Sequence, residues 1–264
     1  MKKNSLSLST LAIALLLLLS ACTPKPEEMH VTTSQAEAHP HWTYEGEEGP
    51  AYWGDIDVSY ATCGTGQSQS PINITSPSEE DLANVALYYQ SSELNILNNG
   101  HTVQANYDEG SYIEVDGMRY DVLQVHFHSP SEHAVDAKPF DAEFHIVHAS
   151  ADGNLAVVGL LVKVGAENAA LAPFIDHLPI DEADVNDTGV KFDLADFLPE
   201  TQTTFRYNGS LTTPPCSEGV NWIVMTSSIE ISADQLAILQ SAFEGNNRPV
   251  QALNDRILIE DATP

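Results

Sequence analysis

Three histidines with the spacing of strand residues are the part of this chain best suited to chemistry. They lie in two short segments of alternating polar and apolar residues, 124–128 (QVHFH) and 143–145 (EFH). Successive side chains of a strand point to opposite faces, so His126 and His128 share one face, and His145 can approach them from another strand. Three imidazoles that converge and leave a fourth position open are typical of a catalytic zinc site, whereas structural zinc is usually closed by four protein ligands.

Two further polar residues lie on the same strand faces. Gln124 and Glu143 each precede one of these histidines by two residues. A zinc-bound imidazole usually donates its second N–H group to a fixed acceptor, and both residues can supply one. His133 and His148 fall outside this alternation, and we interpret them as hydrogen-bonded structural histidines.

The segments that must position these residues have the character of short strands separated by turns. Apolar and β-branched stretches alternate with Asn-Gly and Asp-Gly turn signals, which indicates a sheet-dominated domain. One stretch is nearly all apolar, as expected for a central strand buried on both faces. This stretch is Leu155–Val164, and the other expected strands are Leu94–Leu97, Tyr112–Val115, Tyr120–His128, Ala142–Ala149 and Val220–Ile231.

Helical signals are fewer. Ser232 and Gln235 have the spacing of a capping box, which predicts a helix over Ala233–Phe243. The stretch Ala166–His177 is a second candidate helix. We expect the acidic stretch Asp181–Glu200 to be irregular and to lie on the surface.

The N-terminus has the features of an export signal. Lys2 and Lys3 precede an apolar run at Leu11–Leu19 that is too short for a comfortable bilayer span. The letters at 19–22 (LSAC) resemble the bacterial lipobox, in which the cysteine is lipidated after cleavage. We therefore expect a lipoprotein signal peptide at 1–21, with an ordinary cleaved signal as the alternative.

Residues 22–40 are polar, contain several prolines and show no sustained apolar period, so we expect a flexible tether. The residue after the lipobox cysteine is Thr23 and not an aspartate. By resemblance to known lipoprotein sorting rules, this favours the outer membrane as the destination. These features predict an exported protein, periplasmic or at the cell surface, that is anchored to a membrane through lipid on Cys22.

The cysteines and the net charge indicate the redox compartment and the kinds of partner that this chain can have. Of three cysteines, assigning one to lipid leaves Cys63 and Cys216 in an oxidising compartment, and we predict that they form a disulfide. Two free buried thiols are the alternative. The formal net charge of −28 excludes nucleic acid as a partner and favours a soluble surface, on a monomer or a homodimer.

Longer motifs elsewhere in the chain resemble those of the alpha-class carbonic anhydrases. The resemblance extends from about His41 to Arg256 and implies a catalytic domain at 41–262. It also implies a mainly β (α+β) fold, a single domain around a large twisted, mostly antiparallel central sheet with a few peripheral helices. The motifs, in the order of the family, are 41–44 (HWTY), 69–74 (QSPINI), 98–101 (NNGH), 131–133 (SEH), 211–216 (LTTPPC) and 246–249 (NNRP).

The resemblance implies a zinc lyase that reversibly hydrates carbon dioxide to bicarbonate and a proton. Zn²⁺ would be held by His126, His128 and His145. The fourth ligand would be water whose pKa falls to about 7, a value for which carbonic anhydrase is itself the standard example. Thr212 would accept a hydrogen bond from the resulting hydroxide and donate its own to Glu132.

Further roles follow from the same resemblance. His101 would carry the proton to buffer, because an imidazole with a pKa near 6.5 is suited to that task. Asn246 would join the outer hydrogen-bond partners of the ligands, and the bonds before Pro71 and Pro215 would be cis. Carbon dioxide is uncharged, so its pocket should be largely apolar. That pocket would comprise Val147, Val157, Leu211 and Trp222, with Thr213 beside them.

Two other interpretations stay open. A noncatalytic binding module could use the same fold, since the family includes members that have lost zinc ligands. A zinc-scavenging surface lipoprotein would instead need a mobile His-rich tract, and His30, His39 and His41 are sparse for that purpose. The complete set of three histidines with Glu132 and Thr212 favours the enzyme.

Overall fold

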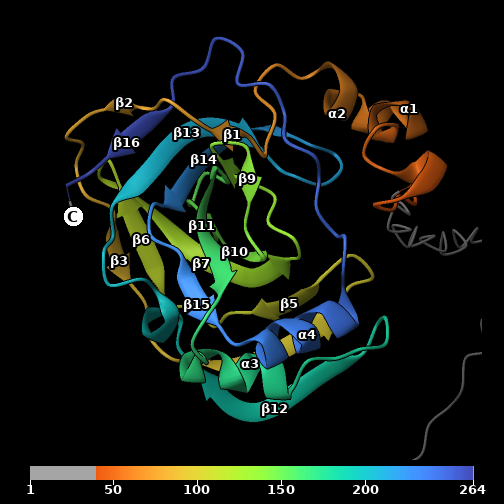
Figure 1. Ribbon diagram of the computed structural model, residues 1–264, viewed down its shortest axis with the longest axis vertical. Helices are drawn as coiled ribbons and strands as arrows, with labels where there is room; N and C mark the ends of the chain where they lie inside the picture. Colours follow the sequence, from red (N-terminus) through yellow and green to blue (C-terminus); the bar gives the residue numbers. More distant parts are fainter. Residues whose placement is uncertain (1–39, 264) are drawn as a thin grey trace, which may run out of the picture. The chain divides into compact units, whose positions relative to one another are not determined.

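Strands dominate the computed structural model, which describes residues 40–263 (Figure 1). The predicted signal peptide, the lipidation site at Cys22 and all of the tether except Pro40 lie outside these described residues. Within residues 40–263, no helix has the length and hydropathy that a bilayer span would need.

Most of the expected strands are present with bounds close to those predicted. The alternating segments around the histidines become β7 and β10, and the nearly all-apolar stretch becomes β11. The strands are β1 (Asn73–Ile74), β2 (Ser78–Glu79), β3 (Ala86–Tyr88), β4 (Ser92–Asn98), β5 (Val103–Asn106), β6 (Tyr112–Val115), β7 (Met118–His128), β8 (Ala134–Val135), β9 (Lys138–Pro139), β10 (Ala142–Ala149), β11 (Leu155–Val164), β12 (Val185–Phe192), β13 (Thr204–Ser210), β14 (Glu218–Met225), β15 (Ile229–Ile231) and β16 (Ile259–Asp261).

One large twisted sheet contains most of these strands. Its order is β12-β4-β5-β7-β10-β11-β14-β13-β16-β2, with β15 also paired to β11 and with β6 paired to β3 and β7. The pairs β11–β14, β11–β15 and β16–β2 are parallel, and the other pairs are antiparallel. The prediction of a large, mostly antiparallel sheet is therefore confirmed. A second, three-stranded sheet has the order β1-β8-β9.

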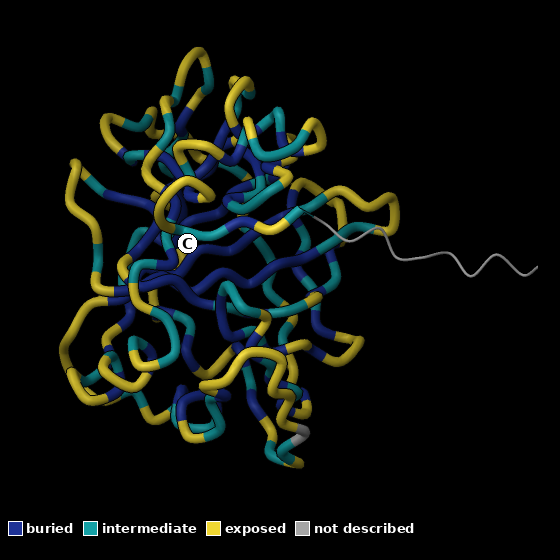
Figure 2. Tube along the Cα trace, turned by 90° about the vertical axis from the view of Figure 1, so that its right-hand side faces the viewer, coloured by how far each residue is buried: buried dark blue, intermediate teal, exposed yellow. Residues whose placement is uncertain are grey.

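The middle of the large sheet places the histidines side by side. β7 and β10 pair antiparallel, with His126 opposite His145 and His128 opposite Glu143. The alternate residues of the same strands point into the main hydrophobic core on the other face. Figure 2 shows these central strands as buried and the surrounding loops as largely exposed. The strands are thus anchored by apolar packing on one face while the other face carries the polar group.

The acidic stretch Asp181–Glu200 is not irregular, and that prediction is wrong. It contains β12, which pairs with β4 at one end of the large sheet. Phe192, Leu194 and Phe197 are buried in the main core, so a few apolar side chains tie an otherwise acidic segment to the fold. The single strand expected at Val220–Ile231 is also wrong, because it is divided into β14 and β15.

Helices are short and peripheral. α4 (Ala233–Ala242) begins at the predicted capping box, in which Ser232 and Gln235 each bond the other's backbone N–H group. The helix expected over Ala166–His177 is shorter than predicted, a 3-10 turn followed by α3 (Ala172–Asp176). Pro173 has no N–H group and fits only the first turn of an α-helix, which sets where α3 begins. The remaining helices are α1 (Trp53–Ile56) and α2 (Thr62–Thr65).

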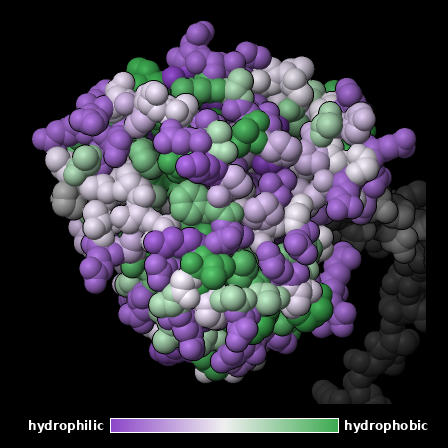
Figure 3. All heavy atoms as spheres, in the orientation of Figure 1, coloured by the Kyte–Doolittle hydropathy of each residue, from purple (hydrophilic) through white to green (hydrophobic). Residues whose placement is uncertain are grey.

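The surface agrees with the acidic composition. Hydrophilic residues cover much of the face drawn in Figure 3, and hydrophobic residues occur between them in smaller patches.

Candidate active site

The structure brings the three predicted ligand histidines together. The ring nitrogens that could bind a metal lie within 4.8 Å of one another. His128 and His145 are buried, and His126 is partly exposed. The group therefore lies at the base of an open cavity, which leaves one side available to a small molecule.

The two histidines of β7 are each held through Nδ1 by an oxygen acceptor. Nδ1 of His126 lies 2.8 Å from Oε1 of Gln124. Nδ1 of His128 lies 2.6 Å from the backbone oxygen of Asn246. Because an oxygen faces each Nδ1, the proton resides there, and the Nε2 lone pair of each ring stays free.

The histidine of β10 has the opposite orientation. Nε2 of His145 lies 3.0 Å from Oε1 of Glu143, which leaves its Nδ1 facing the other two rings. All three outer partners expected from the sequence, Gln124, Glu143 and Asn246, are thus adjacent to the rings.

Burial favours the neutral form of these imidazoles. Desolvation is the main cause that lowers the pKa of each ring, well below the usual value for His126 and to about 4 for His128. Nε2 of His128 is buried without any hydrogen-bond partner among the described residues. Zinc binds neutral imidazoles through such unprotonated nitrogens, so this donor set fits a zinc ion with three protein ligands.

Glu132 lies beside this group and is buried. Its Oε2 is 3.6 Å from Nε2 of His128, and its Oε1 accepts the backbone N–H of Arg248 at 2.8 Å. Burial raises the pKa of Glu132 to about 7, although the nearby His145, the backbone N–H of Arg248 and the hydroxyl of Thr212 oppose that rise. Thr212 is thereby placed near the carboxyl group of Glu132.

A buried hydrogen-bond chain fixes Glu143. Its Oε1 lies 2.7 Å from Nδ1 of His133, whose Nε2 lies 2.6 Å from the hydroxyl of Tyr207. That hydroxyl in turn lies 2.9 Å from Oγ of Ser70. Burial alone would raise the pKa of Glu143, but His133 and His145 outweigh it and hold the pKa well below its usual value. His133 is therefore the hydrogen-bonded structural histidine that the sequence predicts.

His101 lies at the rim of the site and is partly exposed. Its ring stacks on Trp42 with the centroids 3.6 Å apart and the planes 9° from parallel. Its backbone oxygen accepts Nδ2 of Asn246, the residue that also holds His128. Partial burial, and to a smaller extent His41, lower the pKa of His101, while Glu182 opposes them. The ring is therefore neutral near pH 7 and able to take up a proton.

A cavity of about 230 Å³ is lined by His101 and by the two ligand histidines of β7, His126 and His128. Thr213 lines it as expected, but Val147, Val157, Leu211 and Trp222 do not. These four pack together in a hydrophobic cluster next to the ligands, where the ring centroids of Trp222 and His145 are 4.9 Å apart. The lining residues are Trp42, Tyr44, Asn99, His101, Thr102, Gln104, Gln124, His126, His128 and Thr213.

The predicted disulfide between Cys63 and Cys216 is confirmed. Cys216 ends the loop that carries Thr212, and its backbone N–H donates to the oxygen of Thr213. The bonds before Pro71 and Pro215 are cis, as the resemblance implied, and so is the bond before Pro130.

Two residues of the site had no role in the sequence analysis. Arg248 is buried, and its guanidinium donates to Oε1 of Gln69 and to the backbone oxygens of Ser70 and Cys63. Trp42 forms the stacking platform for His101. Trp42 lies in the motif 41–44 (HWTY) and Arg248 in the motif 246–249 (NNRP). Basic residues are rare in this acidic chain, and that rarity was the sequence feature that could have marked Arg248 as important.

The chain matches the family described as eukaryotic-type carbonic anhydrase over residues 48–261. A carbonic anhydrase of Nostoc sp. is 42% identical over 226 residues, covering 83% of this chain and 86% of the relative. One of Pectobacterium carotovorum is 40% identical over 220 residues, covering 83% and 90%. The solved alpha-carbonic anhydrase of Thermovibrio ammonificans, in complex with the inhibitor sulfanilamide, has a TM-score of 0.82 at 42% identity and covers 84% of this chain and 100% of that one.

Proposed function

The chain belongs to the alpha-class, eukaryotic-type carbonic anhydrases, and from this premise we propose that it reversibly hydrates carbon dioxide at a zinc ion held by His126, His128 and His145. The observation that carries the proposal is the set of three converging imidazoles with lowered pKa values, each with an oxygen atom within 3.0 Å of one ring nitrogen. Zinc in this site would supply hydroxide near neutral pH by lowering the pKa of a bound water to about 7, as the carbonic anhydrases themselves exemplify.

Thr212 and Glu132 orient the attacking oxygen. The buried Oε2 of Glu132 has no other hydrogen-bond partner among the described residues, and the Thr212 hydroxyl near it would donate there, so that the hydroxyl oxygen could only accept a hydrogen bond from the attacking group. In that arrangement Thr212 would orient the attacking oxygen toward the substrate. The backbone N–H of Arg248 supports the geometry by fixing the other carboxylate oxygen.

The apolar cluster beside His145 suits an uncharged substrate. Val147 on β10, Val157 on β11 and Trp222 on β14 are direct cross-strand neighbours. Their side chains form an apolar wall beside His145, outside the lining of the 230 Å³ cavity, and a small nonpolar gas that reaches this wall would meet no competing hydrogen bonds.

His101 provides the exit for the proton. It lines the same cavity as His126 and His128, and its partly exposed ring can exchange a proton with buffer. Stacking on Trp42 holds the ring at the rim, between the ligands and solvent.

We also propose that the enzyme works outside the cytoplasm, anchored by lipid on Cys22. The export signal and lipobox resemblance support this, and an oxidising compartment suits the Cys63–Cys216 disulfide. Fractionation of cells that express the wild type or Cys22→Ser tests it. The wild type should sediment with membranes and the variant should be soluble, and identical membrane association of both would refute the anchor.

The proposed activity is tested by stopped-flow carbon dioxide hydration with zinc-loaded protein and added sulfanilamide, the inhibitor bound in the Thermovibrio ammonificans complex. We expect hydration that falls to the background rate as sulfanilamide approaches one molecule per chain. Hydration indifferent to saturating sulfanilamide would contradict the metal-centred site.

A further inference from the structure

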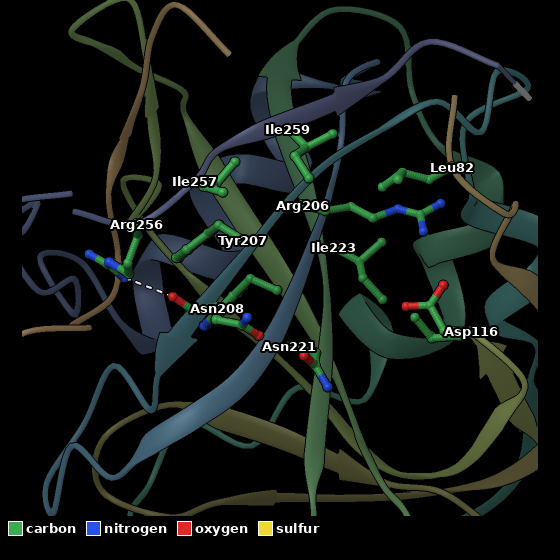
Figure 4. Close-up of a pocket in the computed structure, with 12 residues that line it drawn as sticks. Leu82, Asp116, Arg206, Tyr207, Asn208, Asn221, Ile223, Arg256, Ile257 and Ile259 are labelled. Atoms are coloured by element: carbon green, nitrogen blue, oxygen red, sulfur yellow. Dashed lines mark hydrogen bonds between the residues drawn. The ribbon is translucent and has the colours of Figure 1, made fainter. Parts of the chain in front are cut away.

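A second cavity lies away from the histidines, along β13, β14 and β16 (Figure 4). Its volume is about 420 Å³, larger than that of the cavity at the histidines. Strand alternation directs Arg206 and Ile223 to the face opposite Tyr207 and Trp222, whose rings contact His133. The proposed hydration reaction gives this space no role.

Arg206 is the polar group of this cavity that could bind a ligand. The residue is only 9% exposed. Its Nε donates to Oγ1 of Thr204 at 2.9 Å, and its Nη2 donates to Oδ2 of Asp261 at 2.7 Å. No described residue accepts a hydrogen bond from Nη1, and Figure 4 shows the guanidinium extending toward the side lined by Leu82 and Asp116. Nη1 is not one of the buried atoms that lack a partner, so it is open to the cavity and can donate to an acceptor placed there.

The walls around this guanidinium include five aliphatic residues among the twelve that line the cavity. Ile257 is 66% exposed, an unusual degree for a large apolar side chain next to a cavity. A few polar groups among apolar side chains, in a volume of this size, are the usual composition of a small-molecule site, and Arg206 is the cation there that keeps a guanidinium nitrogen unpaired within the described part of the chain. The aliphatic lining residues are Leu82, Val115, Ile223, Ile257 and Ile259.

The other charged groups of the cavity are mostly engaged. Arg256 donates all of its guanidinium nitrogens to backbone oxygens, one of them of Asn208, the bond drawn in Figure 4. Asp261 is paired with Arg206 and also accepts from Thr263. Asp116 is exposed at the tip of the turn after β6, where water and salt screen its charge.

We propose that this cavity binds a small organic monocarboxylate with an aliphatic body. The carboxylate accepts the free N–H groups of Arg206, because a guanidinium matches a carboxylate in charge and geometry. The hydrocarbon lies against Ile257 and Ile259. The site is separate from the proposed hydration chemistry and does not depend on it.

The test is calorimetric titration of the zinc-loaded full chain with hexanoate, with 1-hexanol as the matched neutral probe. Saturating sulfanilamide blocks the histidine site, so that coordination of hexanoate there cannot account for the heat. We expect saturable hexanoate binding, at least about tenfold tighter than 1-hexanol. No saturation up to about 10 mM, or equal binding of the two probes, would overturn the proposal.

Three substitutions assign the contacts. Arg206→Lys keeps the positive charge beside Asp261 but removes the Nη1 donors, and should weaken hexanoate at least about tenfold. Ile257→Ser, at an exposed position, should weaken it through the loss of apolar contact and serves if the arginine variant does not fold. Asp116→Asn should bind hexanoate as well as the wild type or better. Unchanged binding in both of the first two variants, or loss of binding in Asp116→Asn, would refute the assigned pose.

Discussion

At the scale of single residues, each imidazole of the site is oriented by a different kind of oxygen: an amide, a backbone carbonyl and a carboxylate. Gln124, Asn246 and Glu143 supply them. The amide contact is the simplest to remove, because Gln124 is only partly buried and its loss leaves the backbone intact.

Gln124→Ala should weaken zinc binding by about 10- to 100-fold, since an outer acceptor fixes both the tautomer and the orientation of a ligand ring. Competition with a chelator measures the affinity. Gln104→Ala is the matched control, because Gln104 lines the same cavity but bonds Asn106 and not a histidine. Equal losses in the two variants would show that Gln124 does not act through His126.

His101→Ala should slow carbon dioxide hydration in dilute buffer by at least about 10-fold, with partial rescue by imidazole, because proton exit then limits turnover. His41→Ala is the control, since His41 is nearby and exposed but its ring faces Glu48. Stopped-flow rates against buffer concentration distinguish the two variants. Undiminished turnover of His101→Ala in weak buffer would remove the shuttle assignment.

Residue types and spacing were sufficient to predict the ligands and two of their acceptors, because strand alternation is a local property. The partners that come from distant segments could not be derived that way. The contact of Asn246 with His128 spans 118 positions and that of Arg248 with Glu132 spans 116. Resemblance pointed to Asn246, and nothing in the local pattern pointed to Arg248.

At the scale of elements, the prediction succeeded where hydrophobic period and buried packing agree, as in β7, β10 and β11. It was wrong for β12, whose acidic composition concealed a strand held by Phe192 and the following aromatic and aliphatic contacts. The many acidic residues of this segment describe only its solvent-exposed side chains. Its few buried apolar side chains determine where it packs in the fold.

β10 also carries a titratable group with a consequence for stability. His148 is buried, with Nε2 3.0 Å from the hydroxyl of Tyr89, and burial lowers its pKa to about 4. A folded pKa below the unfolded value of 6.5 means that the unfolded chain binds the proton first. The stabilisation is therefore complete above pH 6.5 and is lost as the pH falls toward 4, by roughly 3 kcal/mol in all.

His148→Gln should flatten this pH dependence, because glutamine does not titrate. Urea unfolding of chelator-treated wild type and variant at several pH values between 7 and 4 measures the slopes. The comparison uses only the slope of the free energy of unfolding against pH. A loss of stability that is the same at every pH therefore does not affect the result. Parallel curves for the two proteins would contradict the assignment.

At the scale of the whole molecule, the disulfide joins α2 to the loop of Thr212 across a sequence separation of 153. The chain-entropy account of such a closure gives a stabilisation of about 2–5 kcal/mol. Its position also links the fold's stability to the loop that carries Thr212.

Replacing both Cys63 and Cys216 by serine should therefore lower the free energy of unfolding by about 2–5 kcal/mol in chemical denaturation. Reduced wild type should behave like the double variant and serves as its control. A loss below about 1 kcal/mol would mean that the rest of the fold fixes this loop without the disulfide.

The central claim is that carbon dioxide hydration depends on one zinc held by His126, His128 and His145. Its most direct test is parallel measurement of zinc content and stopped-flow hydration in wild type and His128→Ala. We predict one zinc per chain with rapid hydration in the wild type. In the variant we predict a loss of both that exceeds the about 10- to 100-fold cost of losing an outer partner. A wild type that binds one zinc without hydrating carbon dioxide, or a variant as active as the wild type, would contradict the account.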